Sequence, residues 1–256
     1  MPKQTRSKAS HFNEKKKSAQ EIQEEIYDME KERYDISKKS ILSEIRIDIK
    51  CKTENQKKFL KLIEENDLTI CLGEAGCGKT FLMCYAALRL LKTNPSYKKI
   101  LLIKSITELK GESLGSLPGS KDEKILFYMM SYLDSFFKLI GESKTKQLIE
   151  DGTIVFEPIA YIRGRNFENS IVCLDETQNV SRDNLKSILS RLSENSKYIV
   201  SGDIEQIDLK NKSESSLEFL YKKAIENPID GVGAIKFEQK DIVRHRLTSY
   251  FLNLFK

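Results

Sequence analysis

The segment LTICLGEAGCGKTFLMCYAALRLL, residues 68–91, decides the fold of this chain. It opens with a short apolar run typical of a buried strand, passes through GEAGCGKT, and ends in a helical pattern that contains neither Gly nor Pro. The central part fits G-x-x-x-x-G-K-[ST], a loop whose backbone N–H groups curl around phosphate oxygens when it joins a strand to a helix. A glycine-rich turn without a ligand is the alternative, and the flanking strand and helix argue against it.

This loop predicts how a nucleotide and a metal ion are held. Lys79 is placed to reach the β- and γ-phosphates, and the Thr80 hydroxyl is placed to ligate Mg²⁺. The positive N-terminus of the following helix adds to the attraction for phosphate. The residues expected to bind the nucleotide here are Gly73, Glu74, Ala75, Gly76, Cys77, Gly78, Lys79 and Thr80.

Two further strand ends carry side chains suited to hydrolysis. The apolar run at residues 171–174 is followed by Asp175 and Glu176. A buried strand would place Asp175 beside Mg²⁺ and Glu176 beside an attacking water, although acidic pairs also follow strands because chains turn there. The next strand ends in SGDIEQ, residues 201–206, where Gln206 is placed to hydrogen-bond the γ-phosphate or the water. A strand-ending turn is the alternative for this segment.

Short β-branched runs alternate with helical patterns from residue 53 onward, which is typical of a parallel sheet. Most of these runs are apolar on both faces. We therefore expect an α/β fold with a mostly parallel sheet covered by helices on both faces. The expected strands are 68–72, 99–103, 153–156, 170–174, 197–201 and 234–237. The expected helices are 80–91, 123–140, 182–192, 215–225 and 241–255.

The composition is that of an ordinary soluble protein. Of 256 residues, 39% are hydrophobic and 32% are charged, which excludes collagen-like and wholly disordered chains. No apolar run approaches the roughly 20 residues of a membrane span, and the N-terminus lacks the apolar core of a signal peptide. We therefore expect a cytoplasmic protein without a membrane partner. The five cysteines form no C-x-x-C pair, so reduced thiols and no zinc site are expected.

The net basic charge of the chain is confined to its N-terminus. The net charge is +5, and residues 1–20 hold six Lys or Arg against the single Glu14. Such a basic flexible tail suits phosphate contacts on a nucleic acid, and a purely solubilising tail is the alternative. Residues 18–34 are dense in Glu and Lys and carry few apolar positions, and we expect a charged helical arm over residues 21–50. One principal domain is expected over residues 51–256.

Five motifs in a fixed order resemble those of a known family. The series GEAGCGKT, PIAYIRGR, VCLDETQN, SGDIEQIDL and DIVRH resembles the PhoH family of P-loop ATPases over residues 51–256. That family is itself similar to the ATPase core of superfamily I helicases. The resemblance implies a RecA-like fold, hydrolysis of ATP with Mg²⁺ as cofactor, and Gln56 as a residue that reads adenine. It also matches residues 115–119 to the family's Gly-Phe-Leu-Pro-Gly loop.

Arginines are candidates for neutralising charge in the transition state, an effect worth roughly 10³–10⁵ in rate at such sites. Arg163 and Arg165, Arg191, and Arg244 with Arg246 compete for this role, and a surface arginine is the alternative for each. The resemblance favours Arg191, which lies where related oligomeric ATPases keep a finger that enters a neighbour's site, and Arg244, which belongs to DIVRH. The expected catalytic residues are Lys79, Glu176, Gln206, Arg191 and Arg244, with Thr80 and Asp175 as metal ligands.

The resemblance also indicates how such an activity is organised. Superfamily I helicases place two ATPase domains in one chain, whereas this chain has length for one, so we expect a homo-oligomer, with a hexameric ring favoured. The expected function is ATP hydrolysis coupled to binding or remodelling of single-stranded nucleic acid, RNA being favoured, with helicase-like activity. Two alternatives stay open, namely an ATP-gated assembly factor without motor activity and a small-molecule P-loop kinase. Glu176 and Gln206 argue against the kinase because they favour the use of water.

Overall fold

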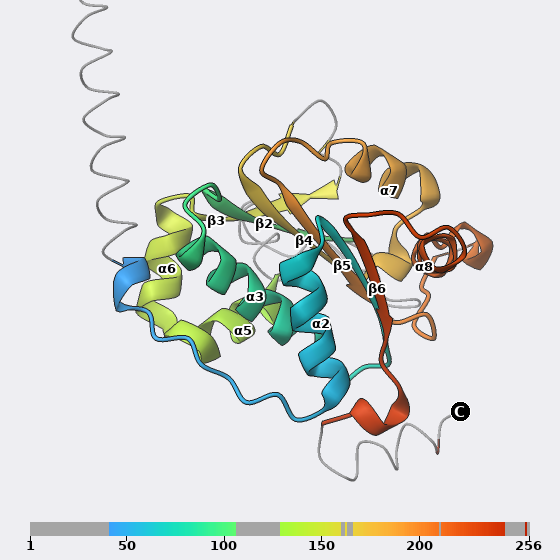
Figure 1. Ribbon diagram of the computed structural model, residues 1–256, viewed down its shortest axis with the longest axis horizontal. Helices are drawn as coiled ribbons and strands as arrows, with labels where there is room; N and C mark the ends of the chain where they lie inside the picture. The colour runs from blue at the N-terminus through green and yellow to red at the C-terminus, as the bar shows by residue number, and fades with distance from the viewer. Residues whose placement is uncertain are drawn as a thin grey trace, which may run out of the picture. The chain divides into compact units, whose positions relative to one another are not determined.

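Six strands form one sheet, and all the strand pairings in the described residues are parallel (Figure 1). The computed structural model describes residues 41–105, 129–159, 162, 166–209, 211–243 and 254. The strands are β1 (Leu68–Leu72), β2 (Lys99–Lys104), β3 (Ile154–Pro158), β4 (Ser170–Asp175), β5 (Lys197–Gly202) and β6 (Val232–Lys236). The expected strands are confirmed, with ends that differ by at most two residues.

The strand order β3-β2-β4-β5-β1-β6 determines where chemistry can occur. Strands β4, β5 and β1 are neighbours, and parallel strands bring their carboxyl ends to the same edge of the sheet. The segments that follow these three strands are the acidic pair, the SGDIEQ segment and the GEAGCGKT loop. Three motifs that are far apart in the sequence therefore meet at one edge.

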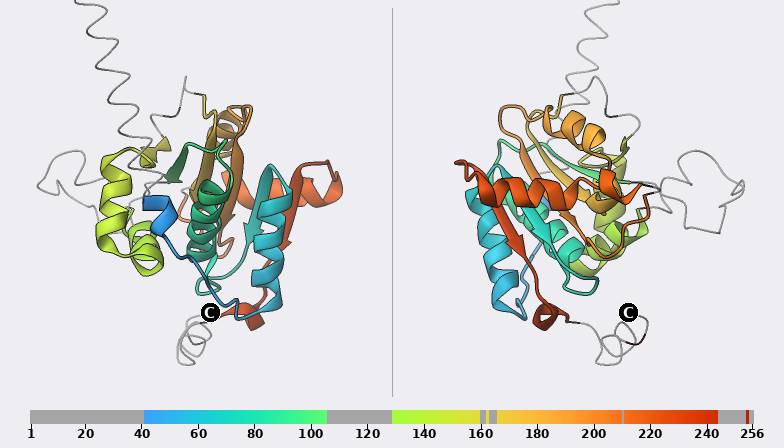
Figure 2. Two further views of the ribbon diagram at one scale, coloured as in Figure 1. Left: turned by 60° about the vertical axis from the view of Figure 1, so that its left-hand side comes forward. Right: turned by 90° about the vertical axis from the view of Figure 1, so that its right-hand side faces the viewer.

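Helices cover both faces of the sheet, as the doubly apolar strands predict (Figures 1 and 2). Within β1, Cys71 packs into the core on one face, whereas Ile70 and Leu72 pack into the core on the other. The first face is covered by α2 (Glu54–Glu65), α3 (Lys79–Thr93), α5 (Met130–Ile140) and α6 (Glu142–Glu150). The second face is covered by α7 (Arg182–Leu189) and α8 (Leu217–Glu226).

Two of these helices, α2 and α6, are absent from the sequence-based expectation. Helix α2 reads ENQKKFLKLIEE and buries only Gln56, Phe59 and Ile63, so its apolar stripe is too short to dominate the pattern. The residue before it, Thr53, caps it by accepting the Gln56 N–H. The helix expected over 241–255 lies almost entirely outside the described residues. No helix in the part of the chain that the structure describes is long and apolar enough to cross a bilayer.

The packed unit begins at Ile41, ten residues before the boundary that composition suggests. Ile41, Leu42 and Ile45 are buried in the core on the α3 face. The Lys92 ammonium at the end of α3 donates to the Ile45 carbonyl and holds this segment in place. Three apolar side chains that precede the expected domain start at residue 51 therefore belong to the packed core.

A buried lysine joins the sheet to the C-terminal end of α2. Lys197, the first residue of β5, is 5% exposed, and its ammonium donates to the carbonyls of Ile63, Glu64 and Asn66. These are carbonyls at a helix end, which lack intrahelical donors. The positive charge also lies at the negative end of the helix dipole. Lys197 therefore fixes α2 against the sheet.

We predict that Lys197→Met lowers the free energy of unfolding by about 2–3 kcal/mol, because the carbonyls at the end of α2 lose a charged donor while the apolar stem is kept. Urea denaturation followed by circular dichroism measures this. The matched control is Lys223→Met, which removes an exposed lysine paired with Glu226 on α8 and should change stability by less than about 0.5 kcal/mol. Equal effects of the two substitutions would contradict the capping role.

Candidate nucleotide-binding site

The GEAGCGKT loop connects the carboxyl end of β1 to α3 and takes a backbone path that requires its glycines. Gly76 and Gly78 have φ values of 100° and 81°, which are readily adopted only by glycine. At Gly73, an added Cβ would come within 2.7 Å of the Phe237 Cβ atom. The motif's glycines are therefore explained by the backbone itself.

The first turn of α3 presents unpaired N–H groups to the loop. The helix begins at Lys79, and the first N–H groups of any α-helix have no intrahelical acceptor. No side chain caps this end of α3. Its N-terminal end also carries the positive end of the helix dipole. A phosphate satisfies both, which is the physical basis for anion binding at this position.

The Lys79 side chain is folded onto the loop in this structure. It is 8% exposed, and its ammonium donates to the carbonyls of Gly73 at 2.7 Å and Glu74 at 2.9 Å. A phosphate group is a stronger partner for an ammonium than a neutral carbonyl. The lysine is thus held beside the loop with a positive charge that a phosphate can take over.

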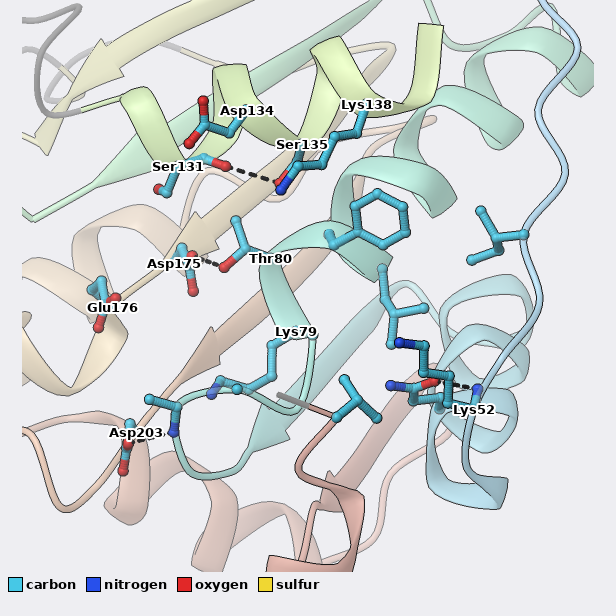
Figure 3. A pocket seen from close by; sticks show the side chains of 18 of the residues that line it. Lys52, Lys79, Thr80, Ser131, Asp134, Ser135, Lys138, Asp175, Glu176 and Asp203 are labelled. Atoms are coloured by element: carbon cyan, nitrogen blue, oxygen red, sulfur yellow. Dashed lines mark hydrogen bonds between the residues drawn. The ribbon is translucent and has the colours of Figure 1, made fainter. Parts of the chain in front are cut away.

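The Asp175 carboxylate lies at the centre of the site (Figure 3). It is 2% exposed and accepts hydrogen bonds from the Thr80 hydroxyl at 2.6 Å and from the Ser201 hydroxyl at 2.6 Å. One buried carboxylate with a hydroxyl beside it fits Mg²⁺, which is commonly held by one or two carboxylates together with phosphate oxygens and waters. The structure thus places Thr80 and Asp175, the two expected metal ligands, in direct contact. Within the described residues, no three His, Cys, Asp or Glu side chains cluster as a complete metal cage.

Glu176, the residue expected to activate water, is held in an unusual environment. Its φ of 52° lies in the left-handed region, which is uncommon for a residue with a side chain. Burial raises the pKa of its carboxyl above the usual value, and the neighbouring Asp175 charge adds to this rise. A carboxylate whose charge is disfavoured in this way is a better proton acceptor than an ordinary glutamate.

Gln178 connects Glu176 to the SGDIEQ segment and is a site residue that sequence reasoning missed. Its side chain is fully buried, and its amide nitrogen donates to Glu176 Oε2 at 2.7 Å and to the Gln206 carbonyl at 3.1 Å. Its amide oxygen accepts the Asp203 N–H at 3.0 Å. A Cβ at Gly202 would come within 2.2 Å of that oxygen, so glycine is required there. The sequence signal for Gln178 was its place in the motif VCLDETQN, two residues after Glu176.

Asp203 connects the same segment to the phosphate loop. Its carboxylate is 5% exposed and accepts the N–H groups of Ala75 at 2.9 Å and Glu205 at 3.0 Å. The Ala75 N–H is therefore engaged outside the loop rather than turned into it. Gln206 itself is exposed at the cavity edge, where its side chain has room to move. The structure thus brings Gln206 to the site without a fixed partner for its side chain.

A cavity of about 640 Å³ is lined by Lys79, Thr80, Asp175, Glu176, Asp203 and Gln206, among others (Figure 3). The loop and the carboxylates contribute to its lining, as do Ile49, Lys50, Lys52, Gln56 and Val243. A further wall comes from α5, whose polar side chains at Ser131, Asp134, Ser135 and Lys138 share one helix face by their spacing. Sequence analysis missed this wall because the more numerous apolar residues of α5 point to a core helix.

Several loop residues line the cavity, whereas the described candidate arginine does not. No arginine among the described residues lines the cavity. Arg191 lies in the connection that leads from α7 to the first residue of β5, at the amino edge of the sheet, while the cavity lies at the carboxyl edge. A six-residue strand separates the two edges by about 17–20 Å. Outside the described residues lie Arg163, Arg165, Arg244, Arg246 and the 115–119 loop.

A parallel sheet with this loop, a buried carboxylate beside its threonine, and a glutamate next to that carboxylate define a P-loop nucleoside triphosphatase fold. The large terminase from a thermophilic bacteriophage has a similar fold, with a TM-score of 0.51 and 11% identity, over 80% of this chain and 50% of that one. At that identity the likeness concerns the fold alone.

The family follows from sequence comparison. The model of the PhoH-like protein family matches residues 48–256, and the chain belongs to that family. It is 38% identical over 207 residues to the PhoH-like protein of Bacillus subtilis (strain 168) and 35% identical over 209 residues to Protein PhoH of Escherichia coli (strain K12). Each match covers 81% of this chain but only 64% and 58% of those relatives, so this chain matches less than two thirds of their length.

We predict that Glu176→Gln raises the free energy of unfolding of the nucleotide-free, Mg²⁺-free protein at neutral pH. The folded state disfavours the Glu176 charge, so ionisation removes stability as the pH rises from the ordinary glutamate pKa of about 4.3 through the raised value in the folded state. The gain should therefore be present at pH 8 and shrink toward pH 4.5. Urea denaturation across this pH range measures it, with the exposed Glu168→Gln as control. A gain that does not depend on pH would contradict the assigned cause.

Proposed function

We propose that the protein hydrolyses ATP with Mg²⁺. One observation supports the proposal. A single cavity is lined by Lys79, Thr80, Asp175 and Glu176, and the Gln178 amide donates a hydrogen bond to the Glu176 carboxylate. This arrangement suits the use of water because the half-buried glutamate is hydrogen-bonded to Gln178 and directly follows Asp175, the residue proposed to hold the metal ion. Family membership supports nucleotide binding, and the ATPase activity itself is our proposal.

Each residue has a role that follows from its contacts. Lys79 exchanges the loop carbonyls for the β- and γ-phosphates, and its charge steadies the leaving group. Thr80 and Asp175 hold Mg²⁺, which when bound withdraws charge from the phosphate oxygens. Glu176 accepts a proton from the attacking water, and Gln178 keeps the accepting oxygen in place. Gln206 is close enough to the cavity to contact the γ-phosphate or the water.

We further propose that the active form is a ring-shaped homo-oligomer acting on single-stranded nucleic acid, with RNA favoured. The absence of arginine among the described cavity residues supports a contribution from another subunit, since hydrolysis at such sites commonly uses one. The net charge of +5 within residues 1–20 supports contact with a phosphate backbone. The alternative is an ATP-gated assembly factor for a protein or ribonucleoprotein, which needs no nucleic-acid stimulation.

We predict that Lys79→Ala abolishes ATP turnover, whereas Glu176→Gln keeps Mg²⁺–ATP binding and lowers turnover by roughly 10²–10⁴. The first change removes the charge at the phosphates, and the second removes only the proton acceptor. Phosphate release measured alone, with single-stranded RNA and with single-stranded DNA tests both the activity and its coupling. The control is Lys223→Met, an exposed lysine on α8.

Normal turnover in a folded Lys79→Ala protein would refute the proposed activity. Loss of nucleotide binding in Glu176→Gln would assign Glu176 to the metal or to the structure. If neither nucleic acid stimulates turnover, the assembly factor becomes the better description. Transfer of phosphate to an added small molecule instead of water would favour the kinase.

We also predict that mixing Lys79→Ala protein with Arg191→Ala or Arg244→Ala protein restores part of the ATP turnover that each lacks alone. In a mixed ring, some interfaces pair an intact phosphate loop with an intact arginine from the neighbour. The rescue should increase with protein concentration because assembly follows mass action. A protein that sediments as a monomer with ATP and hydrolyses it at a concentration-independent specific rate would contradict the oligomer.

A further inference from the structure

Two carbonyl groups of the phosphate loop are held by donors that lie outside the loop. The Gly76 carbonyl accepts the Val243 N–H at 3.1 Å, and the Cys77 carbonyl accepts the Gln56 side-chain amide at 3.0 Å. Neither donor belongs to the loop, to α3 or to the carboxylate strands. These contacts come instead from the start of α2 and from the segment after β6.

The orientation of these two carbonyls sets the orientation of two N–H groups. In a trans peptide the carbonyl of one residue and the N–H of the next point in opposite directions. Because the carbonyls of Gly76 and Cys77 face Val243 and Gln56, the N–H groups of Cys77 and Gly78 point away from these two donors. Successive N–H groups with the same direction form an anion-binding concavity. The Val243 N–H and the Gln56 amide thus set the direction of the Cys77 and Gly78 N–H groups.

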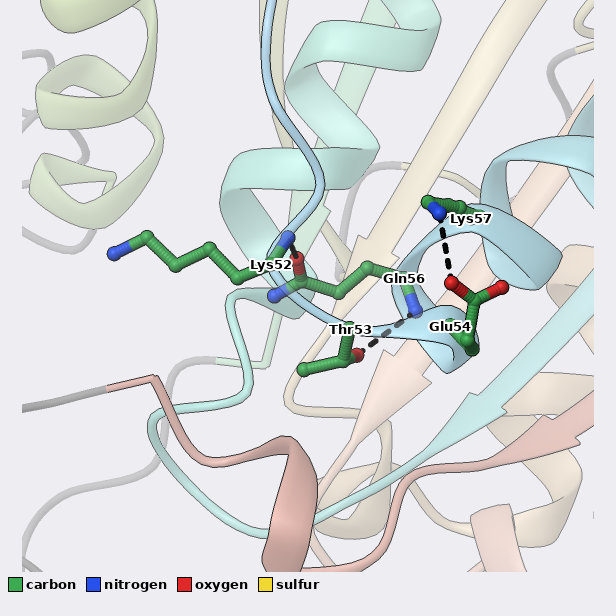
Figure 4. A network of polar contacts seen from close by, with 5 residues as sticks. All are labelled: Lys52, Thr53, Glu54, Gln56 and Lys57. Atoms are coloured by element: carbon green, nitrogen blue, oxygen red, sulfur yellow. Dashed lines mark hydrogen bonds and ion pairs between the residues drawn. The ribbon is translucent and has the colours of Figure 1, made fainter.

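Both polar groups of the Gln56 side chain are already engaged (Figure 4). Its oxygen accepts the Lys52 N–H at 2.7 Å while its nitrogen donates to the Cys77 carbonyl. The residue is only 4% exposed. The two contacts use one lone pair and one N–H of the amide, and they join the loop to the start of α2.

The second donor, Val243, is held by a buried network that also includes α2. Asp241 is 1% exposed and accepts the Asn55 side-chain amide at 2.7 Å and the Glu238 N–H at 2.9 Å. Asn55 precedes Gln56 on the first turn of α2. The positions of Gln56 and Val243 therefore both depend on the N-terminal end of α2, which Thr53 caps.

We propose that Gln56 and the Val243 N–H are positioning groups that hold the phosphate loop ready for an anion. This inference rests on the proposed nucleotide binding and assigns Gln56 a different role from the one its family resemblance implies. Its consequence is that the loss of Gln56 weakens every ligand that carries the same phosphates, whatever base is attached.

The test compares the affinities of wild type and Gln56→Met for Mg²⁺–ATP, Mg²⁺–GTP and Mg²⁺–tripolyphosphate by calorimetry. Methionine keeps the length and removes both polar groups. We expect all three affinities to fall by the same factor of about ten, with the ATP-to-GTP ratio unchanged. Gln56→Glu should lower them further, because an oxygen would then face the Cys77 carbonyl. Thermal unfolding of each variant monitors folding.

A second pair of variants tests the backbone donor independently of Gln56. Val243→Pro removes the N–H that reaches Gly76, and Val243→Ala keeps it. The preceding Ile242 has φ −70° and ψ 117°, an extended conformation that a following proline accepts. We expect the proline variant alone to show the uniform loss. This pair also decides the proposal if Gln56→Met does not fold.

A loss for ATP that leaves GTP and tripolyphosphate unchanged would overturn the inference and make Gln56 a base-reading residue. No loss for any ligand in Gln56→Met and Val243→Pro would overturn it as well. If the wild-type protein binds none of the three ligands, the proposed function fails, and the inference fails with it. These outcomes separate the two levels, since only the last concerns nucleotide binding itself.

Discussion

The buried carboxylate of Asp175 is the contact on which the site depends. A carboxylate that is 2% exposed is unfavourable unless it is hydrogen-bonded, and here Thr80 from α3 and Ser201 from β5 each donate to one of its oxygens. The first bond joins residues that are 95 apart in the sequence, and the second joins residues that are 26 apart. They form because β4, β5 and β1 are adjacent and parallel, which brings the ends of these strands together. The strand order of the sheet therefore determines the geometry of the site.

A second layer of contacts surrounds that centre and links the segments to one another. Gln178 bonds to Glu176 and to both ends of the segment 203–206, and Asp203 bonds in turn to Ala75 of the phosphate loop. The phosphate loop and the glutamate are therefore connected through two buried side chains, Asp203 and Gln178. Partly satisfied buried networks are unstable, so these polar groups are expected to move together rather than one at a time.

The fold was predictable from the sequence because its signals are local. Apolar runs bounded by polar turns gave the strands, and the GEAGCGKT loop placed the first strand and helix. Helix α2 was missed because it buries few side chains, and the packed start at Ile41 was missed because three apolar residues are hidden in a charged stretch. Such contacts depend on what the chain packs against, and composition does not record that.

The site was predictable only where a motif carries its own chemistry. Lys79, Thr80, Asp175 and Glu176 could be assigned because their residue types and spacing match a known use, whereas Gln178 and Asp203 act through buried contacts with distant backbone groups. The described part of the cavity contains charged side chains of both signs. Its lining includes the lysines Lys50, Lys52, Lys79 and Lys138 and the carboxylates Asp134, Asp175, Glu176 and Asp203, so the positive and negative side chains balance. No described arginine lines the cavity, so the guanidinium that hydrolysis at such sites commonly uses would come from the remaining segments or, as proposed above, from a neighbouring subunit.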